Sequence, residues 1–262
     1  MGNPFVRTKE QVEAMQNLIS NGKFMHNCLR AEFETDMDFL AEVLPPCFEP
    51  PEEPIVVASI GKWQSHFCGE FDSSAIYMNC KYNGVEGSTM LALFTSGDMP
   101  VAIGREGWGE GKKEAVSEIY RCGNKMYGFV ERRGEKLYEI NAELTEDIAP
   151  YTSVGPDFEI KAQPAANGIG LQHDPVLVEM EITSENLCER DGVGTLTFFE
   201  GRYDKLNAIP IKKVNKVFYI EGISTWNVQN MISLPDGDKY LPYIFGQKYD
   251  DLTQYHVADC FK

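Results

Sequence analysis

The stretch from Pro100 to Lys113 has the most unusual spacing of reactive residues in this sequence. It reads Pro-Val-Ala-Ile-Gly-Arg-Glu-Gly-Trp-Gly-Glu-Gly-Lys-Lys, and its apolar start predicts a short strand that runs into a glycine-rich bend. Glycines before a lysine are typical of phosphate loops. A Walker A motif, however, needs a glycine where Glu106 stands and a serine or threonine where Lys113 stands. Taken alone, the two lysines are typical of a solvated surface pair.

Other motifs for catalysis or metal binding are missing from the sequence. The glycines do not follow the GxGxxG spacing of a dinucleotide fold, and there is neither a GxSxG hydrolase elbow nor an HExxH zinc motif. Two possible metal ligands stand two residues apart at His66 and Cys68, and this spacing in a strand is more often ordinary packing. We therefore expect no metal site.

The composition describes a folded, acidic protein. Of the 262 residues, 43% are hydrophobic and 24% are charged, close to the average of globular proteins. The 40 acidic residues exceed the 24 basic ones by 16, and a charge of −16 repels nucleic-acid phosphates and anionic lipid headgroups. We therefore expect neither a nucleic-acid partner nor a membrane partner.

The cysteines and the first residues bear on the cellular compartment. Seven cysteines without CxxC spacing favour free thiols in a reducing compartment. The first ten residues carry charges where a signal peptide needs an apolar stretch, and no run approaches the ~18 apolar residues of a membrane span. The sequence therefore predicts a cytoplasmic protein.

Hydrophobic periodicity predicts the elements that surround the glycine-rich stretch. Thr8 and Gln11 form a capping box before a helix that ends at Asn21, and a second helix should run from about residue 36 to Val43. Residues 24–34 alternate as a strand. One face carries Leu29, Ala31 and Phe33, and the other carries His26, Cys28, Arg30, Glu32 and Glu34.

Further β-like segments indicate a mostly β protein. They lie at residues 55–60, 74–82, 88–95, 126–132, 136–142, 176–183, 194–200 and 207–221. Many short antiparallel strands without a repeat or a flexible linker predict a barrel or sandwich in a single domain over residues 1–262.

The stretch that ends in the two lysines resembles the signature of the acetoacetate decarboxylase family, in which a strand leads to Gly-Arg-Glu, a short bend and Lys-Lys. Other landmarks of that family occur in the same order over roughly residues 24–225. They are Thr35-Asp-Met-Asp-Phe-Leu40, Glu53-Pro54, Tyr82-Asn-Gly-Val85, Leu177–Thr183, Gly194–Phe198 and Leu206–Val214. Their order and spacing indicate membership more strongly than any one of them.

By this resemblance, Lys112 is the Schiff-base lysine and Lys113 is the neighbour that depresses its pKa. The family is the standard example of a lysine activated by burial or by a nearby cation. A nucleophilic amine at neutral pH needs a pKa about 3–4 units below the ordinary ~10.4 of lysine. Because successive side chains of an extended chain point to opposite faces, Lys113 need not share the pocket. We expect burial of Lys112 to contribute at least as much as the neighbouring charge.

The sequence departs from the family pattern at the groups that should accompany the lysine. The decarboxylases have an arginine on the first strand, a glutamate after the Glu-Pro landmark and another before the Asn-Gly turn. Counted from the shared landmarks, these positions fall on His26, Ser59 and Ser73.

Six residues are candidates for contacts with substrate: His26, Arg30, Glu70, Asp72, Arg105 and Trp108. His26 could transfer protons, a β-bulge could turn Glu70 or Asp72 inward, and Trp108 could wall an apolar pocket with Trp63. Surface positions for Arg30, Glu70 and Asp72 are the alternative, as is a structural role for Arg105 in holding the bend.

The resemblance implies a mostly β (α+β) fold, with antiparallel sheets around a closed, cone-like β-barrel, a few peripheral helices and the lysine inside. It also implies a homo-oligomeric lyase that needs no cofactor and acts on a β-keto acid or related carbonyl compound. Because the usual partners of the lysine are replaced, we favour aldol chemistry, dehydration or cyclisation in secondary metabolism over simple decarboxylation. The alternative is a barrel that binds small molecules, or acts as a non-covalent catalyst, without imine chemistry.

Overall fold

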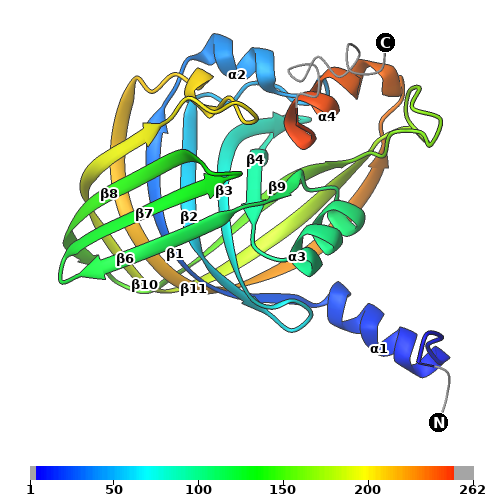
Figure 1. The fold of residues 1–262 in the computed structure, drawn as a ribbon, viewed down its shortest axis with the longest axis horizontal. Coiled ribbons are helices and arrows are strands. Elements are labelled where there is room, and N and C mark those ends of the chain that lie inside the picture. Colours follow the sequence, from blue (N-terminus) through cyan, green and yellow to red (C-terminus); the bar gives the residue numbers. More distant parts are fainter. Residues whose placement is uncertain (1–3, 251–262) are drawn as a thin grey trace.

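The computed structural model of the protein describes residues 4–250 (Figure 1). Within this range eleven strands join into one sheet, with four α-helices at its edges. The helices are α1 (Lys9–Ser20), α2 (Met37–Val43), α3 (Asp98–Ile103) and α4 (Leu241–Lys248). The strands are β1 (Gly22–Glu34), β2 (Ile55–Ser65), β3 (Gly69–Tyr82), β4 (Val85–Thr95), β5 (Lys112–Glu114), β6 (Val116–Cys122), β7 (Lys125–Arg132), β8 (Glu135–Ile148), β9 (Tyr151–Lys161), β10 (Val176–Phe198) and β11 (Lys213–Ser233).

Seven strands follow one another in a ring, in the order β1, β2, β3, β4, β9, β10 and β11, and β11 pairs back with β1. In the described residues, six of the joints are antiparallel ladders. The seventh joins β4 and β9 through a single parallel bridge between Ser88 and Asp157. The expected barrel is therefore present, but it is not strictly closed at this seam.

A second layer continues from the ring through β10. This 23-residue strand pairs with β9 and β11 and also with β8, which leads on to β7 and β6. The largest apolar core contains Leu29, Ala31 and Phe33 of β1 together with Val130 and Ile140 of the second layer. The alternation of residues 24–34 predicts that Leu29, Ala31 and Phe33 share one face of β1. The second layer covers this face, and the core lies between them.

The other face of β1 points into the ring. Phe24 and Cys28 lie there in a separate cluster with Trp63, Trp108 and Phe218. The alternation predicted for residues 24–34 is therefore confirmed, because one strand supplies two different cores.

Most predicted elements are confirmed. Thr8 and Gln11 form the capping box of α1, and β1, α2, β2, β3, β4, β7 and β8 occur where expected. The segments 176–183 and 194–200 are parts of one strand, β10, and residues 207–212 precede β11. The pattern missed β6, β9 and α4.

The strand predicted at Pro100–Ile103 is wrong. These residues belong to α3, which continues into one turn of π-helix at Gly104–Trp108. A run of four apolar residues does not distinguish a strand from a short helix by periodicity, and Pro100 in the first turn is compatible with helix because no backbone donor is needed there.

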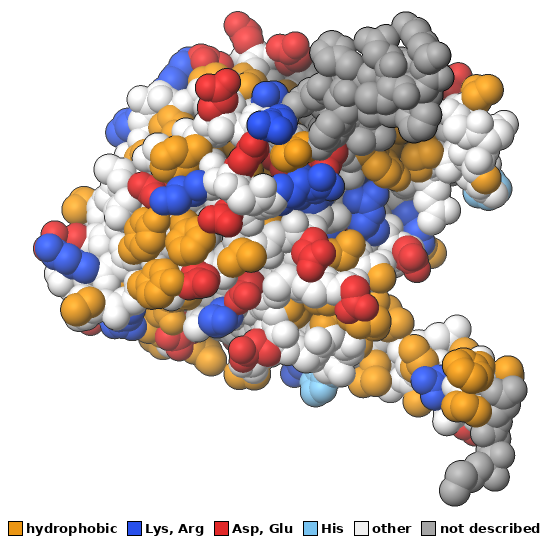
Figure 2. Space-filling model, in the orientation of Figure 1, with side chains coloured by type: hydrophobic (Ala, Val, Ile, Leu, Met, Phe, Trp, Pro, Cys, Tyr) orange, Lys and Arg blue, Asp and Glu red, His pale blue; other side chains and the backbone are white. Residues whose placement is uncertain are grey.

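Two features of the surface bear on partners. Helix α1 extends away from the sheet, and its apolar side chains Val12, Met15 and Leu18 are exposed (Figures 1 and 2). Acidic and basic side chains are interspersed over the face seen in Figure 2.

Within residues 4–250, no helix is long and apolar enough to cross a membrane. The six cysteines of this range are free, and Cys260 lies outside it.

Candidate active site

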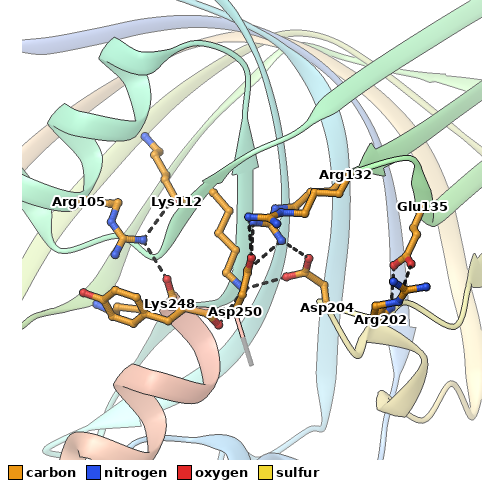
Figure 3. Close-up of polar contacts among 11 residues, drawn as sticks. Arg105, Lys112, Arg132, Glu135, Arg202, Asp204, Lys248 and Asp250 are labelled. Atoms are coloured by element: carbon orange, nitrogen blue, oxygen red, sulfur yellow. Dashed lines mark hydrogen bonds and ion pairs between the residues drawn. The ribbon is translucent and has the colours of Figure 1, made fainter. Parts of the chain in front are cut away.

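Strand β5 places the two lysines on opposite faces. It pairs with β4 in parallel, so that Lys112 lies beside Leu93 and Lys113 beside Phe94. Lys112 points into the ring and is only 6% exposed. Figure 3 shows its side chain directed away from the group formed by Arg132, Asp204 and Asp250. The extended pair therefore separates the lysines, as the sequence predicted.

Lys112 ends at a small, mostly apolar cavity. The cavity measures about 20 Å³, room for about one water molecule. The wall includes the uncharged aromatic rings of Phe24, Trp63, Phe71 and Trp226. A fifth aromatic residue, Tyr77, also lines the cavity, and burial raises the pKa of its phenol, which therefore stays protonated. The complete wall consists of Phe24, Trp63, Phe71, Ser73, Tyr77, Met90, Leu93, Glu110, Lys112 and Trp226.

Glu110 is the charged partner of Lys112. Its Oε2 lies 2.8 Å from Lys112 Nζ, and the glutamate is only 1% exposed. The contact is an ion pair without hydrogen-bond geometry, and neither carboxylate oxygen accepts a hydrogen bond within the described residues. A buried carboxylate with free lone pairs beside an amine is placed to exchange protons with it.

Two glycines allow this approach. A Cβ atom on Gly104 would lie 2.3 Å from Glu110 Oε2 and 2.5 Å from Lys112 Cδ. Gly109 ends the π-helix at a φ of +87°, and a Cβ atom there would lie 2.3 Å from the Cα atom of Lys161. The glycines of the bend therefore serve close packing, since no other residue fits at either position.

Arg105 braces the lysine strand from outside the cavity. Its Nη1 donates to the carbonyl oxygens of Lys112, at 3.1 Å, and Lys248, at 3.0 Å, and its guanidinium lies 4.9 Å from the ring centre of Tyr249 (Figure 3). Its predicted contact with substrate is not supported. The alternative of a structural role fits, and the partners are backbone carbonyls.

Two acids inside the ring, Asp157 and Glu159, were missed by sequence reasoning. They alternate on β9, and both are buried. Burial raises the pKa of Asp157 to about 7, with a further rise from the charge of Glu110, although Ser88 Oγ donates to it at 2.6 Å. Burial and neighbouring Asp157 raise the pKa of Glu159 well above its ordinary value. The available signal was two acids two residues apart, in a segment that the pattern did not assign to a strand.

A further lysine lies against these acids. Lys248, at the end of α4, donates to the carbonyl oxygens of Gly109 and Ile160. Burial lowers its pKa to about 8, and the charge of Arg105 acts in the same direction, while Glu159 opposes them. The end of α4 is thereby tied to the bend that carries Glu110.

His26 and Arg30 lie on the inner face of β1 but do not line the Lys112 cavity. His26 stacks on Trp63 with ring centres 4.8 Å apart, and its Nδ1 lies 3.4 Å from Ser224 Oγ. Burial and the charge of Arg30 lower its pKa to about 3, so the imidazole is neutral near pH 7. Its predicted role in proton transfer at the cavity is therefore not supported.

Glu70 and Asp72 lie on the opposite face of β3 from Ser73. Asp72 pairs with Lys62 at 3.0 Å, and Glu70 accepts a hydrogen bond from Gln64 at 3.1 Å. The prediction that a bulge turns one of them inward is wrong, because the β2–β3 ladder keeps its register from Val56 to Ser65. The surface alternative is the one that the structure supports.

Trp108 supports the cavity from behind. Its ring centre lies 6.2 Å from that of Phe24 and 5.7 Å from that of Trp226, both of which line the cavity. Trp63 lines the cavity itself. The two tryptophans therefore form successive layers of one aromatic wall.

Lys113 belongs to a separate cluster of charges with Arg132, Asp204 and Asp250 (Figure 3). Its Nζ lies 2.8 Å from Asp204 Oδ1, and Arg132 Nη1 lies 2.8 Å from the other Asp204 oxygen. Burial alone would raise the pKa of Asp250, but the hydrogen bond from Arg132 and the charges of Arg132 and Lys113 lower it. Lys113 therefore joins β5 to distant parts of the chain. In residues 4–250, no group of three or more potential ligands is placed to hold a metal ion.

Known proteins share both the sequence pattern and this fold. The curated acetoacetate decarboxylase of Burkholderia cenocepacia is 29% identical over 141 residues, which cover 52% of this chain and 57% of that protein. The solved acetoacetate decarboxylase of Legionella pneumophila superposes with a TM-score of 0.74 at 19% identity and covers 89% of this chain and 98% of its own. The enduracididine biosynthesis enzyme MppR, solved with pyruvate, superposes with a TM-score of 0.70 at 18% identity. The superposition covers 81% of this chain and 90% of the MppR chain.

The match to the family covers more of the chain than the alignment with the curated relative does. A sequence profile described as acetoacetate decarboxylase matches residues 6–233, which include the ring, the second layer, the glycine-rich bend and both lysines. This match covers most of the chain and agrees with the ring-shaped fold. The chain with its buried lysine and aromatic cavity belongs to the acetoacetate decarboxylase family.

Proposed function

We propose that the protein is a Schiff-base lyase in which Lys112 forms an imine with a carbonyl substrate. The observation that carries the proposal is the buried pair of Lys112 and Glu110 at an aromatic cavity. Family membership supports the same reaction class, because the family is the standard example of lysine imine catalysis.

The groups around Lys112 suit the formation of an imine. Glu110 takes a proton from the lysine ammonium, and the amine electron pair then adds to the carbonyl carbon. Glu110 returns a proton to the carbinolamine oxygen, so that water leaves and a protonated imine remains. The neighbouring aromatic side chains exclude other water from this imine.

The protonated imine then accepts an electron pair from a bond to the adjacent carbon. In decarboxylation the breaking bond is the one to the carboxylate, and carbon dioxide leaves. In aldol chemistry or dehydration the breaking bond can be a C–H bond whose proton goes to Glu110. Hydrolysis of the final imine restores Lys112 and releases the product.

We favour aldol chemistry or dehydration over decarboxylation. The two glutamate positions of the decarboxylases hold Ser59 and Ser73, and the structure supplies Glu110 from a different element. MppR has been solved with the condensation product of pyruvate and imidazole 4-carboxaldehyde, which supports condensation chemistry on this fold. Aldol condensation, dehydration or cyclisation in secondary metabolism is therefore the proposed reaction type.

Borohydride trapping tests the proposal. The protein is incubated with a panel of ketones and keto acids, reduced, digested and examined by mass spectrometry. We expect a secondary amine at Lys112 and none in Lys112→Met. If no carbonyl compound is trapped at Lys112 in the folded protein, the chain is instead a small-molecule binding protein or a non-covalent catalyst.

We also propose that the protein acts in the cytoplasm as a homo-oligomer. The exposed apolar stripe of α1 supports self-association, since a helix of 12 residues is marginal without a surface to pack against. Light scattering on the full chain and on Leu18→Lys tests the oligomer, which should dissociate in the variant. An unchanged mass would exclude α1 from the interface.

A further inference from the structure

The cavity beside Lys112 is too small for a whole substrate. Its volume of about 20 Å³ holds one water molecule, or a single group of similar size such as a methyl group. A ketone that forms an imine with Lys112 has two branches on its carbonyl carbon. At least one of these branches must therefore lie outside this inner cavity.

An outer cavity of about 540 Å³ lies beside the inner one, between α3 with the bend that follows it and the ends of β9 and α4. Its wall includes the small side chains of Val101, Ala102 and Ala162. It also includes charged side chains of both signs, among them Glu114 and Lys248. A space of this size and polarity suits a chain of several carbon atoms that ends in a carboxylate or another polar group.

The two cavities meet at Glu110. Among the described residues, it is the one that lines both. Its ion pair with Lys112 holds its carboxylate, and neither carboxylate oxygen accepts a hydrogen bond within residues 4–250. The side chain can therefore turn aside without breaking a hydrogen bond, and the boundary between the cavities can open at this residue.

Arg30 marks a second direction from the inner cavity. It faces the ring interior from β1, and its Nε atom is buried without a hydrogen-bond partner in the described part of the chain. Burial raises the pKa of Tyr77 in the wall of the inner cavity, and the charge of Arg30 opposes this rise. Arg30 lines neither cavity, however. The outer cavity, which shares Glu110 with the inner one, is therefore the better supported place for the second branch.

We propose that the substrate is a carbonyl compound with two unequal branches. One branch is no larger than a methyl group and lies in the inner cavity, and the other is a longer, polar branch that extends past Glu110 into the outer cavity. The proposal rests on the imine at Lys112. The substrate reaches Lys112 from the outer cavity, and Glu110 turns aside as it enters and then exchanges protons with Nζ.

The test compares two isomeric keto acids of equal charge. The wild-type protein is incubated with 8-oxononanoate, a methyl ketone with one long branch, or with 6-oxononanoate, which has a propyl branch in place of the methyl group. The imine at Lys112 is reduced with borohydride and quantified by mass, and each yield is divided by the yield of the same keto acid with Nα-acetyl-lysine methyl ester. We expect 8-oxononanoate to be trapped at least about tenfold more, because a propyl group overfills a space for one water molecule.

The outcomes separate this proposal from the imine itself. If no carbonyl compound of any kind is trapped at Lys112, the imine is refuted. If other ketones are trapped but neither isomer is, the imine stands and the unequal branches are refuted. Equal trapping of the two isomers, or more of 6-oxononanoate, has the same meaning.

Variants locate the longer branch. Ala102→Trp and Ala162→Trp fill the outer cavity from two sides, and each should lower trapping of 8-oxononanoate at least about tenfold. The matched control is Ala166→Trp, at an exposed position that lines neither cavity, which should keep the wild-type yield. Circular dichroism checks that all three proteins are folded. Trapping that survives both fillings in folded proteins overturns the outer cavity as the binding site, and its loss in Arg30→Met would place the branch toward Arg30 instead.

The ratio of the two isomers tests Glu110, because this ratio does not depend on the overall yield. Glu110→Ala joins the two cavities and should bring the ratio to within about threefold. Glu110→Gln keeps the size of the side chain and should keep the wild-type ratio, although both yields fall with the loss of the proton acceptor. The same ratio in both variants would contradict the role of Glu110 as the boundary between the cavities.

Discussion

Lys112 and Lys113 are adjacent in the sequence and lie in opposite surroundings. Lys112 faces a small aromatic cavity, where Glu110 is its one charged contact within the described residues. Lys113 faces Asp204 and Asp250, which it shares with Arg132. The second lysine of the motif thus ties β5 to Asp204 and Asp250, whereas the first is buried behind the glycine-rich bend.

The pKa values of buried acids are shifted in opposite directions in the two regions. Inside the ring, burial raises the pKa of Asp157 to about 7, and the charge of Glu110 adds to the rise. Beside Lys113, the pKa of Asp250 is lowered in spite of burial, because Arg132 donates to it and Lys113 adds a second positive charge. Asp157 therefore retains its proton up to about neutral pH, whereas Asp250 is ionised.

The largest expected effect separates the lysines by chemistry. Lys112→Met should abolish trapping of every carbonyl compound, because no amine remains at the cavity. Lys113→Met should keep trapping within about threefold of wild type, since Lys113 does not face the cavity. Quantitative mass spectrometry after reduction measures both. Loss of trapping in a folded Lys113→Met protein would contradict the separation of the two regions.

The next effect is the pH dependence of stability. Between the ordinary carboxyl pKa and about 7, the native state holds a proton on Asp157 that the unfolded chain has lost, so this group makes the free energy of unfolding fall as pH rises. Asp157→Asn should remove this fall and should be more stable than wild type above pH 7 by about 3–4 kcal/mol. Denaturant unfolding from pH 4 to 8 measures it.

The control for Asp157 comes from an exposed aspartate. Asp38→Asn, in the first turn of α2, should leave the slope with pH unchanged. On the Lys113 side the sign is opposite, because the lowered pKa of Asp250 stabilises the protein above the ordinary carboxyl pKa and this contribution is lost on acidification. Identical slopes in wild type and Asp157→Asn would contradict a protonated acid inside the ring.

A third effect concerns stability on the Lys113 side. Lys113→Met leaves Asp204 and Asp250 with fewer cations and should lower the free energy of unfolding by about 3 kcal/mol. The matched control is Lys62→Met, because the partly exposed ion pair of Lys62 with Asp72 should contribute less than about 1 kcal/mol. Urea unfolding of the two variants at pH 7 compares them. An equal loss in both would contradict the role of Lys113 in holding β5.

The smallest effect tests the backbone of the bend. Gly104→Ala places a methyl group against Glu110 and Lys112, and their displacement should lower trapping about tenfold. Gly107→Ala is the matched control in the same turn, because a Cβ atom there meets no heavy atom nearer than 4.0 Å. Similar trapping in both variants would show that the close approach at Gly104 is unimportant.

The sequence predicted the elements better than the contents of the site. Residues 24–34 alternate clearly because one strand faces two apolar cores, and the capping box at Thr8 is a local signal. Glu110 was visible in the motif, but nothing local shows that its carboxylate turns back toward Lys112. That contact depends on a π-helical turn and on Gly104, which tertiary packing decides.

The misplaced acids have a similar cause. The prediction that a bulge could turn Glu70 or Asp72 inward rests on analogy with a glutamate that the decarboxylases have and this chain lacks. The alternative, surface positions, holds because the uninterrupted β2–β3 register fixes both residues outside. Asp157 and Glu159, which do face inward, come from a strand that the pattern missed. The register of paired strands and the closure of a ring depend on contacts between distant parts of the chain. The sequence of one strand does not show which strands it pairs with.

The seam between β4 and β9 is the weakest joint of the ring. Within the described residues, this is the one joint of the ring with a single backbone bridge, and Asp157 of that bridge lies among the acids inside the ring. Parting these two strands would break one backbone bridge, whereas parting any other neighbouring pair of the ring would break a long ladder of hydrogen bonds. The ring therefore resists opening least at this seam.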